Sequence, residues 1–309
     1  MPLAQYGTTM LLNLALAIAV GTCTTILWTT QATSAWARSR VRTVRGLGLV
    51  ALAVAVCASA GLLWLEAAAM AEVPLAQAAG AVRLMLTSTH LGLAWKIGMG
   101  ALLLGIAAMS FASSGRHAGV LMFVALTALA GFLYTRSMVS HASASGDFSL
   151  TMVVDWIHLT LICLWVGEVV VSGFVVLATS AGASPGDRND CARYVELLST
   201  SATLALVGIF VTGLFNAWFN LGGTSALVRH PYGTTLLIKL TLVMGAVLLG
   251  AANRFIVMPG LIASLRSGHL AAGKATRQFT LLLRIEAAVL VTVLIMAAIL
   301  SSSSPPTAG

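Results

Sequence analysis

The chain has 309 residues, of which 59% are hydrophobic and 8% are charged, and its formal net charge is +8. A soluble globular protein carries about 25% charged residues, so this composition excludes a water-facing surface of ordinary size. The 17 Lys and Arg residues are spread along the chain rather than gathered into one patch, which argues against nucleic acid as a partner. We therefore expect an all-α, polytopic bundle in a lipid membrane.

Eight apolar stretches are long enough to cross a bilayer, which takes about 20 residues of helix. In chain order they are expected at 8–33, 46–71, 88–112, 118–138, 150–179, 195–220, 233–258 and 277–301. The chain thus divides into a four-helix half at 1–149, a second four-helix half at 150–301 and a disordered tail at 302–309. The segment 72–89 is too polar to cross and is expected to lie flat on the membrane surface.

The distribution of basic residues predicts the orientation of these spans. Eleven Lys and Arg residues fall in the loops after the first, third, fifth and seventh spans, and three fall in the loops on the other side. Because cytoplasmic loops carry the excess of basic residues, both termini are expected in the periplasm of a bacterium, with the bundle in its inner membrane. Three further basic residues, Lys96, Lys239 and Arg284, lie inside spans and need partners or water.

With this topology, four histidines lie at or near periplasmic ends: His90, His141, His158 and His230. Met138 is three residues before His141, and Asp155 is three residues before His158, so each pair shares a helix face. Thioethers favour Cu(I), and imidazole with carboxylate favours Cu(II). The sequence therefore predicts a periplasm-facing copper site, with these ligands: His90, His141, His158, Met138 and Asp155.

Each of these ligands also has a structural interpretation. A membrane histidine can bond a carbonyl of a neighbouring helix, and Met commonly fills gaps in apolar packing. His230, in an expected loop, reads as an interfacial residue. The oxidation state of the copper stays open between Cu(I) and Cu(II).

Charged residues deep inside spans give a second signal, because each is costly in a bilayer and functional by default. Glu168 lies on the same broad face as His158 and Trp165, and it follows His158 by about 15 Å along the helix. A transport path is predicted along Trp165, Glu168, Asn216 and Lys239. The alternative is a set of neutralising pairs, such as Glu168 with Arg284. A cationic Lys239 would oppose a cation, which favours either a paired Lys239 or a redox role.

Four strings in the second half resemble the copper resistance D (CopD) family. They are His158 with Trp165-Val166-Gly167, then Thr212-Gly213-Leu214-Phe215-Asn216-Ala217-Trp218, then Tyr232-Gly233 with Leu236-Leu237-Ile238-Lys239, and Asn253-Arg254-Phe255 with Pro259. The resemblance covers about residues 150 to 300. It implies an inner-membrane protein of copper homeostasis that imports copper beside a periplasmic copper-binding partner of the CopC type. Glu168 stands where the family commonly has a second glycine.

Two further functions remain open at this stage. CopD-like bundles also resemble families that bind b-type haem through histidines, so His158 and a histidine from another helix would be axial ligands in a redox protein. A copper sensor or scaffold that conducts nothing is the other. No catalytic residues are predicted, and no enzyme activity is expected. The chain lacks the GxxxxGK[ST] motif of an ATP-driven pump, so transport would be passive, potential-driven or partner-driven.

Overall fold

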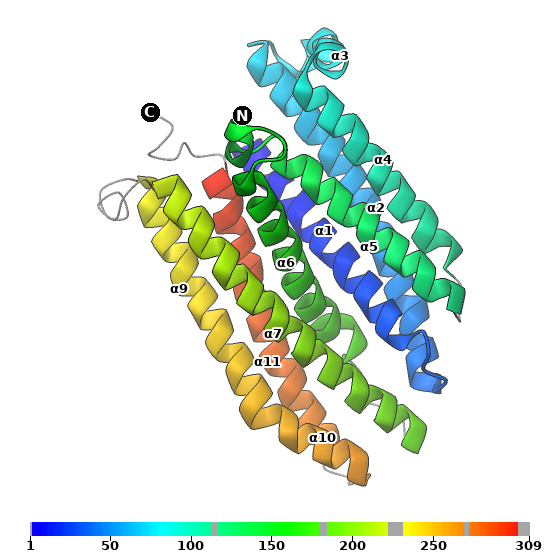
Figure 1. The fold of residues 1–309 in the computed structure, drawn as a ribbon. Helices are drawn as coiled ribbons and strands as arrows, with labels where there is room; N and C mark the ends of the chain where they lie inside the picture. Colours follow the sequence, from blue (N-terminus) through cyan, green and yellow to red (C-terminus); the bar gives the residue numbers. More distant parts are fainter. Residues whose placement is uncertain (1, 113–115, 179–183, 222–230, 269–271, 302–309) are drawn as a thin grey trace.

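The computed structural model describes residues 2–112, 116–178, 184–221, 231–268 and 272–301, and within these ranges it is helical with no strands (Figure 1). The long elements are α1 (Pro2–Thr29), α2 (Ala35–Met70), α4 (His90–Phe111), α5 (Arg116–Ser137), α6 (Leu150–Val171), α7 (Pro185–Leu221), α9 (Pro231–Ala252) and α11 (Ala272–Ser301). The short ones are η1 (Leu75–Gln77), α3 (Ala79–Ser88), η2 (His141–Ser145), η3 (Ser172–Val176), η4 (Asn253–Val257) and α10 (Met258–Ser267). In this part of the chain, eight helical segments are long and apolar enough to span a membrane, which confirms the predicted all-α polytopic bundle.

Two of the spanning helices start about ten residues earlier than the sequence predicted. Helix α2 begins at Ala35 rather than at 46, and α7 begins at Pro185 rather than at 195. The Ser34 hydroxyl caps α2 by accepting a hydrogen bond from the Ala37 backbone N–H at 3.1 Å. An Asp187 carboxylate oxygen accepts another from the Trp36 N–H at 2.8 Å. Arginines that were expected in loops therefore lie on helical turns at the end of the bundle.

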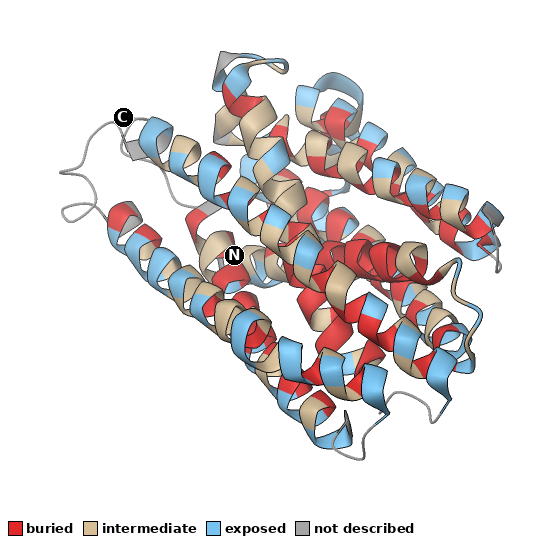
Figure 2. Ribbon diagram, turned by 60° about the horizontal axis from the view of Figure 1, so that its bottom comes forward, coloured by how far each residue is buried: buried red, intermediate tan, exposed pale blue. Residues whose placement is uncertain are grey.

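Helix α1 lies in the middle of the bundle, between α2 and α6, although it belongs to the first predicted half (Figure 1). It is the most enclosed span, with 67% of its most apolar stretch buried, whereas 11% is buried in the span formed by α9 and α10. Buried residues gather where helices face one another, and exposed residues lie on the outer faces (Figure 2). The two halves therefore share one core. The division between them stays a prediction, and the predicted tail lies outside the described residues.

Helices α1 and α6 touch through their backbones because small residues line the contact. A Cβ placed on Gly21 would lie 2.2 Å from the Gly167 carbonyl oxygen, and one on Gly167 would lie 1.9 Å from the carbonyl oxygen of Ala17. Close approach through small residues is the usual means by which membrane helices associate without a hydrophobic driving force. This contact fixes the residue that follows Gly167, which is Glu168, against the centre of the bundle.

The segment between α2 and α4 forms η1 and α3. In Figure 1, α3 is seen nearly end-on, across the direction of α2 and α4. The Trp64 indole N–H donates to the Leu75 carbonyl oxygen at 2.9 Å and so ties η1 to α2. This crosswise course fits the surface helix that the sequence predicted at 72–89.

Candidate functional site

A stripe of polar side chains runs along one side of α6 and into η3. Its members are Asp155, His158, Trp165, Glu168 and Ser172, and their spacings of three, seven, three and four residues keep them on one helix face. From Asp155 to Ser172 the stripe covers about 26 Å at 1.5 Å per residue. A hydrocarbon core is about 30 Å thick, so the stripe reaches across most of a membrane.

The hydrogen bonds of His158 fix which of its ring nitrogens carries the proton. Its Nδ1 lies 2.9 Å from the Thr212 hydroxyl oxygen on α7. That hydroxyl has one proton, which it donates to the Gly208 carbonyl oxygen at 2.7 Å. We therefore assign the ring proton to Nδ1, as the donor to Thr212, and the lone pair to Nε2; the Ile209 backbone also accepts a hydrogen bond from the ring. A neutral imidazole held in this way is the form that ligates a metal ion.

The α7 surface beside His158 is shaped for the ring. A Cβ on Gly213 would lie 3.0 Å from Cε1 of His158, so glycine leaves the room that the imidazole occupies. Asn216, a predicted path residue, follows Thr212 by one helical turn and therefore lies on the same α7 face. Thr212 and Gly213 thus form the α7 surface that faces the imidazole.

Asp155 is half-buried one turn from His158, and two serines hold one of its carboxylate oxygens. The Ser137 hydroxyl donates to Oδ2 at 2.8 Å, and the Ser140 hydroxyl donates to the same oxygen at 3.3 Å. The positive charges of Lys239 and Arg136 both act on this carboxylate. The two serine hydroxyls therefore orient the Asp155 carboxylate, and positive charges on α5 and α9 offset its negative charge.

Charges of alternating sign surround the part of the stripe that contains Asp155 and His158. Electrostatic interactions link Glu66 on α2 with Arg136, and Arg136 with Asp155. Asp155 in turn interacts electrostatically with Lys239, and the charge of Lys239 also affects His158. The ion pairs within 4.0 Å among the described residues are elsewhere, at His90 with Asp147 and at Arg266 with Glu196. The carboxylate of Asp155 therefore offsets part of the charge of Lys239 without direct ion-pair contact, and the place of Lys239 on a transport path stays a prediction.

The third member of the stripe, Trp165, connects α6 to a carboxyl group on α11. Its indole N–H donates to Oε1 of Glu286 at 3.2 Å, and both side chains are buried. The same Oε1 would lie 3.2 Å from a Cβ on Gly250 of α9, so this glycine gives the carboxyl group its space. Three helices thus meet around the Trp165–Glu286 contact.

Glu168 is fully buried, with none of its surface exposed. Its Oε1 accepts a hydrogen bond from the Ser201 hydroxyl on α7 at 2.7 Å, and its Oε2 is buried without a hydrogen-bond partner among the described residues. The predicted neutralising pair with Arg284 is wrong. The Arg284 Nε donates to the Gly173 carbonyl oxygen at 2.9 Å, and its guanidinium lies over the ring of Phe174.

Tyr194 of α7 closes the Ser172 end of the stripe. Its hydroxyl oxygen lies 2.7 Å from the Ser172 hydroxyl and 3.1 Å from that of Thr25 on α1. The rings of Trp28 and Trp36 pack edge-on against its ring. This aromatic and hydroxyl cluster holds α1, α2, η3 and α7 together where the stripe ends.

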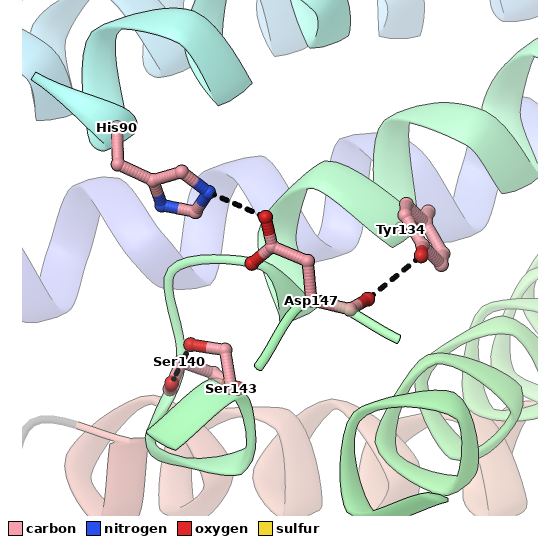
Figure 3. Close-up of polar contacts among 5 residues, drawn as sticks. All are labelled: His90, Tyr134, Ser140, Ser143 and Asp147. Carbon is pink, nitrogen blue, oxygen red and sulfur yellow. Dashed lines mark hydrogen bonds and ion pairs between the residues drawn. The ribbon is translucent and has the colours of Figure 1, made fainter. Parts of the chain in front are cut away.

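At the Asp155 end, a second group of polar residues, the loop group, surrounds the loop between α5 and α6 (Figure 3). His90, at the start of α4, places Nε2 at 2.8 Å from an Asp147 carboxylate oxygen, and the Tyr134 hydroxyl donates to the Asp147 carbonyl oxygen at 2.8 Å. Both His90 and Asp147 are partly exposed, at 49% and 33%. Met138 is half-buried just after α5.

The predicted copper ligands are therefore placed in two groups rather than one. His90 faces Asp147 in the loop, whereas His158 and Asp155 face α7 and α5 further in. Among the described residues, no group of three or more His, Cys, Asp or Glu side chains could hold a metal ion as they stand. The side chain of His141 and all of His230 lie outside the described residues. The five-ligand site stays a prediction.

Several hydrogen-bond partners of the stripe and of His90 were not predicted as site residues from the sequence. Ser201, Thr212 and Ser137 each bond an ionisable member of the stripe, and Asp147 bonds His90. Serine and threonine are common in membrane helices, so their identity alone gives no signal. Thr212 is the exception, because it is the first residue of the string 212–218, by which the chain resembles a known family.

Comparison with known proteins supports this resemblance in both halves. The family described as "Copper resistance protein D" matches residues 192–300, and the family described as "Copper resistance protein D-like, N-terminal domain" matches residues 2–150. The chain is 28% identical to "Copper resistance protein D" of Pseudomonas syringae pv. tomato over 239 residues, which are 75% of this chain and 71% of that protein. It is 28% identical to "Copper transport protein CutJ" of Bacillus subtilis (strain 168) over 123 residues, which are 40% of this chain and only 22% of that protein. No solved structure matches.

Proposed function

The chain belongs to the copper resistance protein D family, and from this premise we propose that it carries copper ions across a bacterial inner membrane, from the periplasm to the cytoplasm. The observation that carries the proposal is the polar stripe on α6, which reaches from the loop group of His90 to the cluster around Tyr194. A protein that only held helices together would have no need of ionisable groups spaced along most of a membrane's thickness.

His158 is the central copper ligand in this proposal. Its Nδ1 is committed to Thr212, so Nε2 presents a lone pair in a half-buried place one turn from a carboxylate. Imidazole nitrogen binds both Cu(I) and Cu(II). The carboxylate of Asp155 offsets part of the positive charge that copper would add beside Lys239.

The loop group supplies the first capture of copper from the periplasm. His90 and Asp147 are partly exposed, and Met138 lies at the end of α5 in the same loop. A small periplasmic copper-binding protein of the CopC type would deliver its ion here, where imidazole, carboxylate and thioether groups are within reach of the surface. Copper then passes to His158 and Asp155.

Beyond His158 the route follows α6 inward along Trp165 and the carboxyl groups of Glu168 and Glu286. On this face, α6 carries the apolar residues Leu161 and Ile162 between His158 and Trp165, so the ion crosses a short barrier between two polar sections. In the outer section the charges of Glu66 and Asp155 offset those of Arg136 and Lys239.

The test is copper uptake by the purified protein in lipid vesicles, measured as metal content by mass spectrometry. His158→Ala should abolish uptake and remove most bound copper. His117→Ala is the matched control, because His117 is exposed at the opposite end of the bundle and should change neither quantity. Intact copper binding in the His158→Ala protein would contradict the assigned site. Copper that binds to the wild-type protein and is never transported would favour a sensor or scaffold instead.

A further inference from the structure

Glu168 differs from the other ionisable members of the stripe because it has no charged partner. Its carboxyl group is fully buried, one oxygen accepts from Ser201, and the other has no hydrogen-bond partner among the described residues. A carboxylate anion buried in this way loses its hydration without gaining a counter-ion, and such a group takes up a proton instead of staying charged.

The charged and titratable groups on the neighbouring helices do not neutralise it. Helix α1, whose backbone touches α6 at Gly167, contains no charged residue, and its titratable side chains are Tyr6 and Cys23. From α7 the nearby titratable group is Tyr194, whose hydroxyl is bonded to Ser172 and Thr25. Neither helix therefore brings a cation to the Glu168 carboxyl group.

The basic residues of the remaining neighbours are engaged elsewhere. On α11, Arg284 is bonded to the Gly173 carbonyl oxygen, and the acidic Glu286 accepts from Trp165. Arg254 of η4 donates to the Ser199 backbone and hydroxyl oxygens and to the Thr203 hydroxyl oxygen. Those two residues flank Ser201 at a spacing of two, which puts them on a different side of α7 from Ser201 and Glu168.

Arg136 of α5 and Lys239 of α9 lie toward the Asp155 end of the stripe. The charge of Arg136 acts on Glu66 and Asp155, and that of Lys239 acts on Asp155. Asp155 precedes Glu168 by 13 residues, or about 20 Å along α6. The part of η3 that follows, Ser172–Val176, contains no titratable side chain.

The donor chemistry also separates Glu168 from the copper ligands. Cu(I) prefers sulfur and imidazole nitrogen, whereas the carboxyl and hydroxyl oxygens of Glu168 and Ser201 are hard donors that suit it poorly. The same oxygens are well suited to bind and release a proton. Ser201 stabilises either form, because its hydroxyl can donate to a carboxylate or accept from a carboxylic acid.

We propose that Glu168 is a proton-exchange site which makes this protein a copper–proton exchanger: the carboxyl group holds a proton at rest and releases it to the periplasmic side as Cu(I) enters the bundle. The inference rests on the proposed transport function. The O–H bond of the carboxylic acid breaks, the proton passes to water, and the resulting carboxylate balances the single charge of Cu(I). When copper leaves toward the cytoplasm, a proton from that side restores the acid. Copper keeps its oxidation state throughout, and the net charge inside the bundle does not change.

The resting proton is tested without any copper, by infrared spectroscopy of the purified protein in lipid. The carbonyl stretch of a protonated carboxylic acid is separate from that of a carboxylate. The spectrum of wild type minus Glu168→Gln should contain this acid band at neutral pH, and the spectrum of wild type minus Glu196→Gln should not. Glu196 is the control because it is 40% exposed and paired with Arg266. A carboxylate band in the first difference spectrum would overturn the proposal, whatever copper does.

The exchange is tested in vesicles that enclose a pH-sensitive dye, with Cu(I) added outside under anaerobic conditions. Wild type and Glu196→Gln should take up copper while the lumen becomes more alkaline, and Glu168→Gln should lose both signals while still binding copper at the outer site. Copper uptake by wild type with no change or a fall in lumenal pH would refute the exchange but leave transport standing. An absence of copper uptake by wild type would instead refute the transport function, and the exchange with it, while the infrared result would still decide where the proton lies.

Discussion

The hydrogen bond between Thr212 and His158 allows a sharp test of the copper site. Replacing Thr212 with Val keeps the branched shape but removes the hydroxyl that accepts from Nδ1 at 2.9 Å and donates to the Gly208 carbonyl oxygen at 2.7 Å. The imidazole would then lose the partner that fixes its protonation pattern. Either nitrogen could carry the proton, and the ring could rotate toward the space beside Gly213.

The size of the effect follows from what such a partner contributes. Loss of a residue that orients a metal-bound histidine typically lowers metal affinity by about 10-fold to 100-fold. That range corresponds to about 1.4 to 2.8 kcal/mol of binding free energy. We expect Thr212→Val to weaken copper binding by this amount and Thr212→Ser, which retains the hydroxyl, to bind as wild type does.

Two measurements check the expectation separately. Titration of the purified proteins against a copper chelator of known affinity gives the binding constants. Nitrogen NMR of ¹⁵N-histidine-labelled protein reports which ring nitrogen of His158 carries the proton, and this should be Nδ1 in wild type and in Thr212→Ser. Equal copper affinity in wild type and Thr212→Val would refute the role of Thr212. A wild-type His158 protonated at Nε2 would refute the argument from the hydroxyl proton.

The remaining predictions concern packing, the loop group and the haem alternative. Gly167→Ala should destabilise the protein by about 1 to 3 kcal/mol, because the added methyl group would meet the Ala17 carbonyl oxygen; thermal unfolding in detergent checks this against Gly131→Ala, which has open space around it. His90→Ala should slow copper uptake at low copper concentration yet leave most tightly bound copper in place, whereas His158→Ala should remove that copper. Metal analysis after desalting distinguishes the two variants. Equal losses of bound copper would mean a single shared site. The purified protein should show no haem Soret band in its absorbance spectrum, and a Soret band lost in His158→Ala would identify a haem redox protein.

The number and approximate position of the spans could be predicted from the sequence because lipid imposes a strict requirement on composition. Each crossing needs about 20 apolar residues with its backbone bonded within the helix, so apolar length alone locates it. Where a helix continues into water, this constraint ends. Helices α2 and α7 continue past the predicted limits through Arg-containing turns, which composition cannot distinguish from loops.

The members of the site could be predicted in part, and their partners could not. Helical periodicity correctly placed Glu168 on the same face as His158 and Trp165, since spacing along a helix fixes that face. Which helix packs against that face depends on rotation and contact between spans far apart in sequence. Ser201 on α7 occupies the position beside Glu168 where Arg284 was expected. The same difficulty applies to Glu286, which reaches Trp165 from a helix 121 residues away.

The chemistry of the α6 stripe changes along its length, and this change bears on how a cation could cross. In one part, His158 and Asp155 lie among charges of alternating sign, and in the proposed function copper would bind there without a large change in the local field. In the other part, Glu168 and Glu286 are buried carboxyl groups bonded only to neutral donors, Ser201 and Trp165, among the described residues. A fixed cation in that part would block copper, and a fixed anion would trap it, because charges interact strongly where water is excluded. A group whose charge appears only while the ion is present avoids both outcomes, and a carboxyl group that can hold or release a proton has this property.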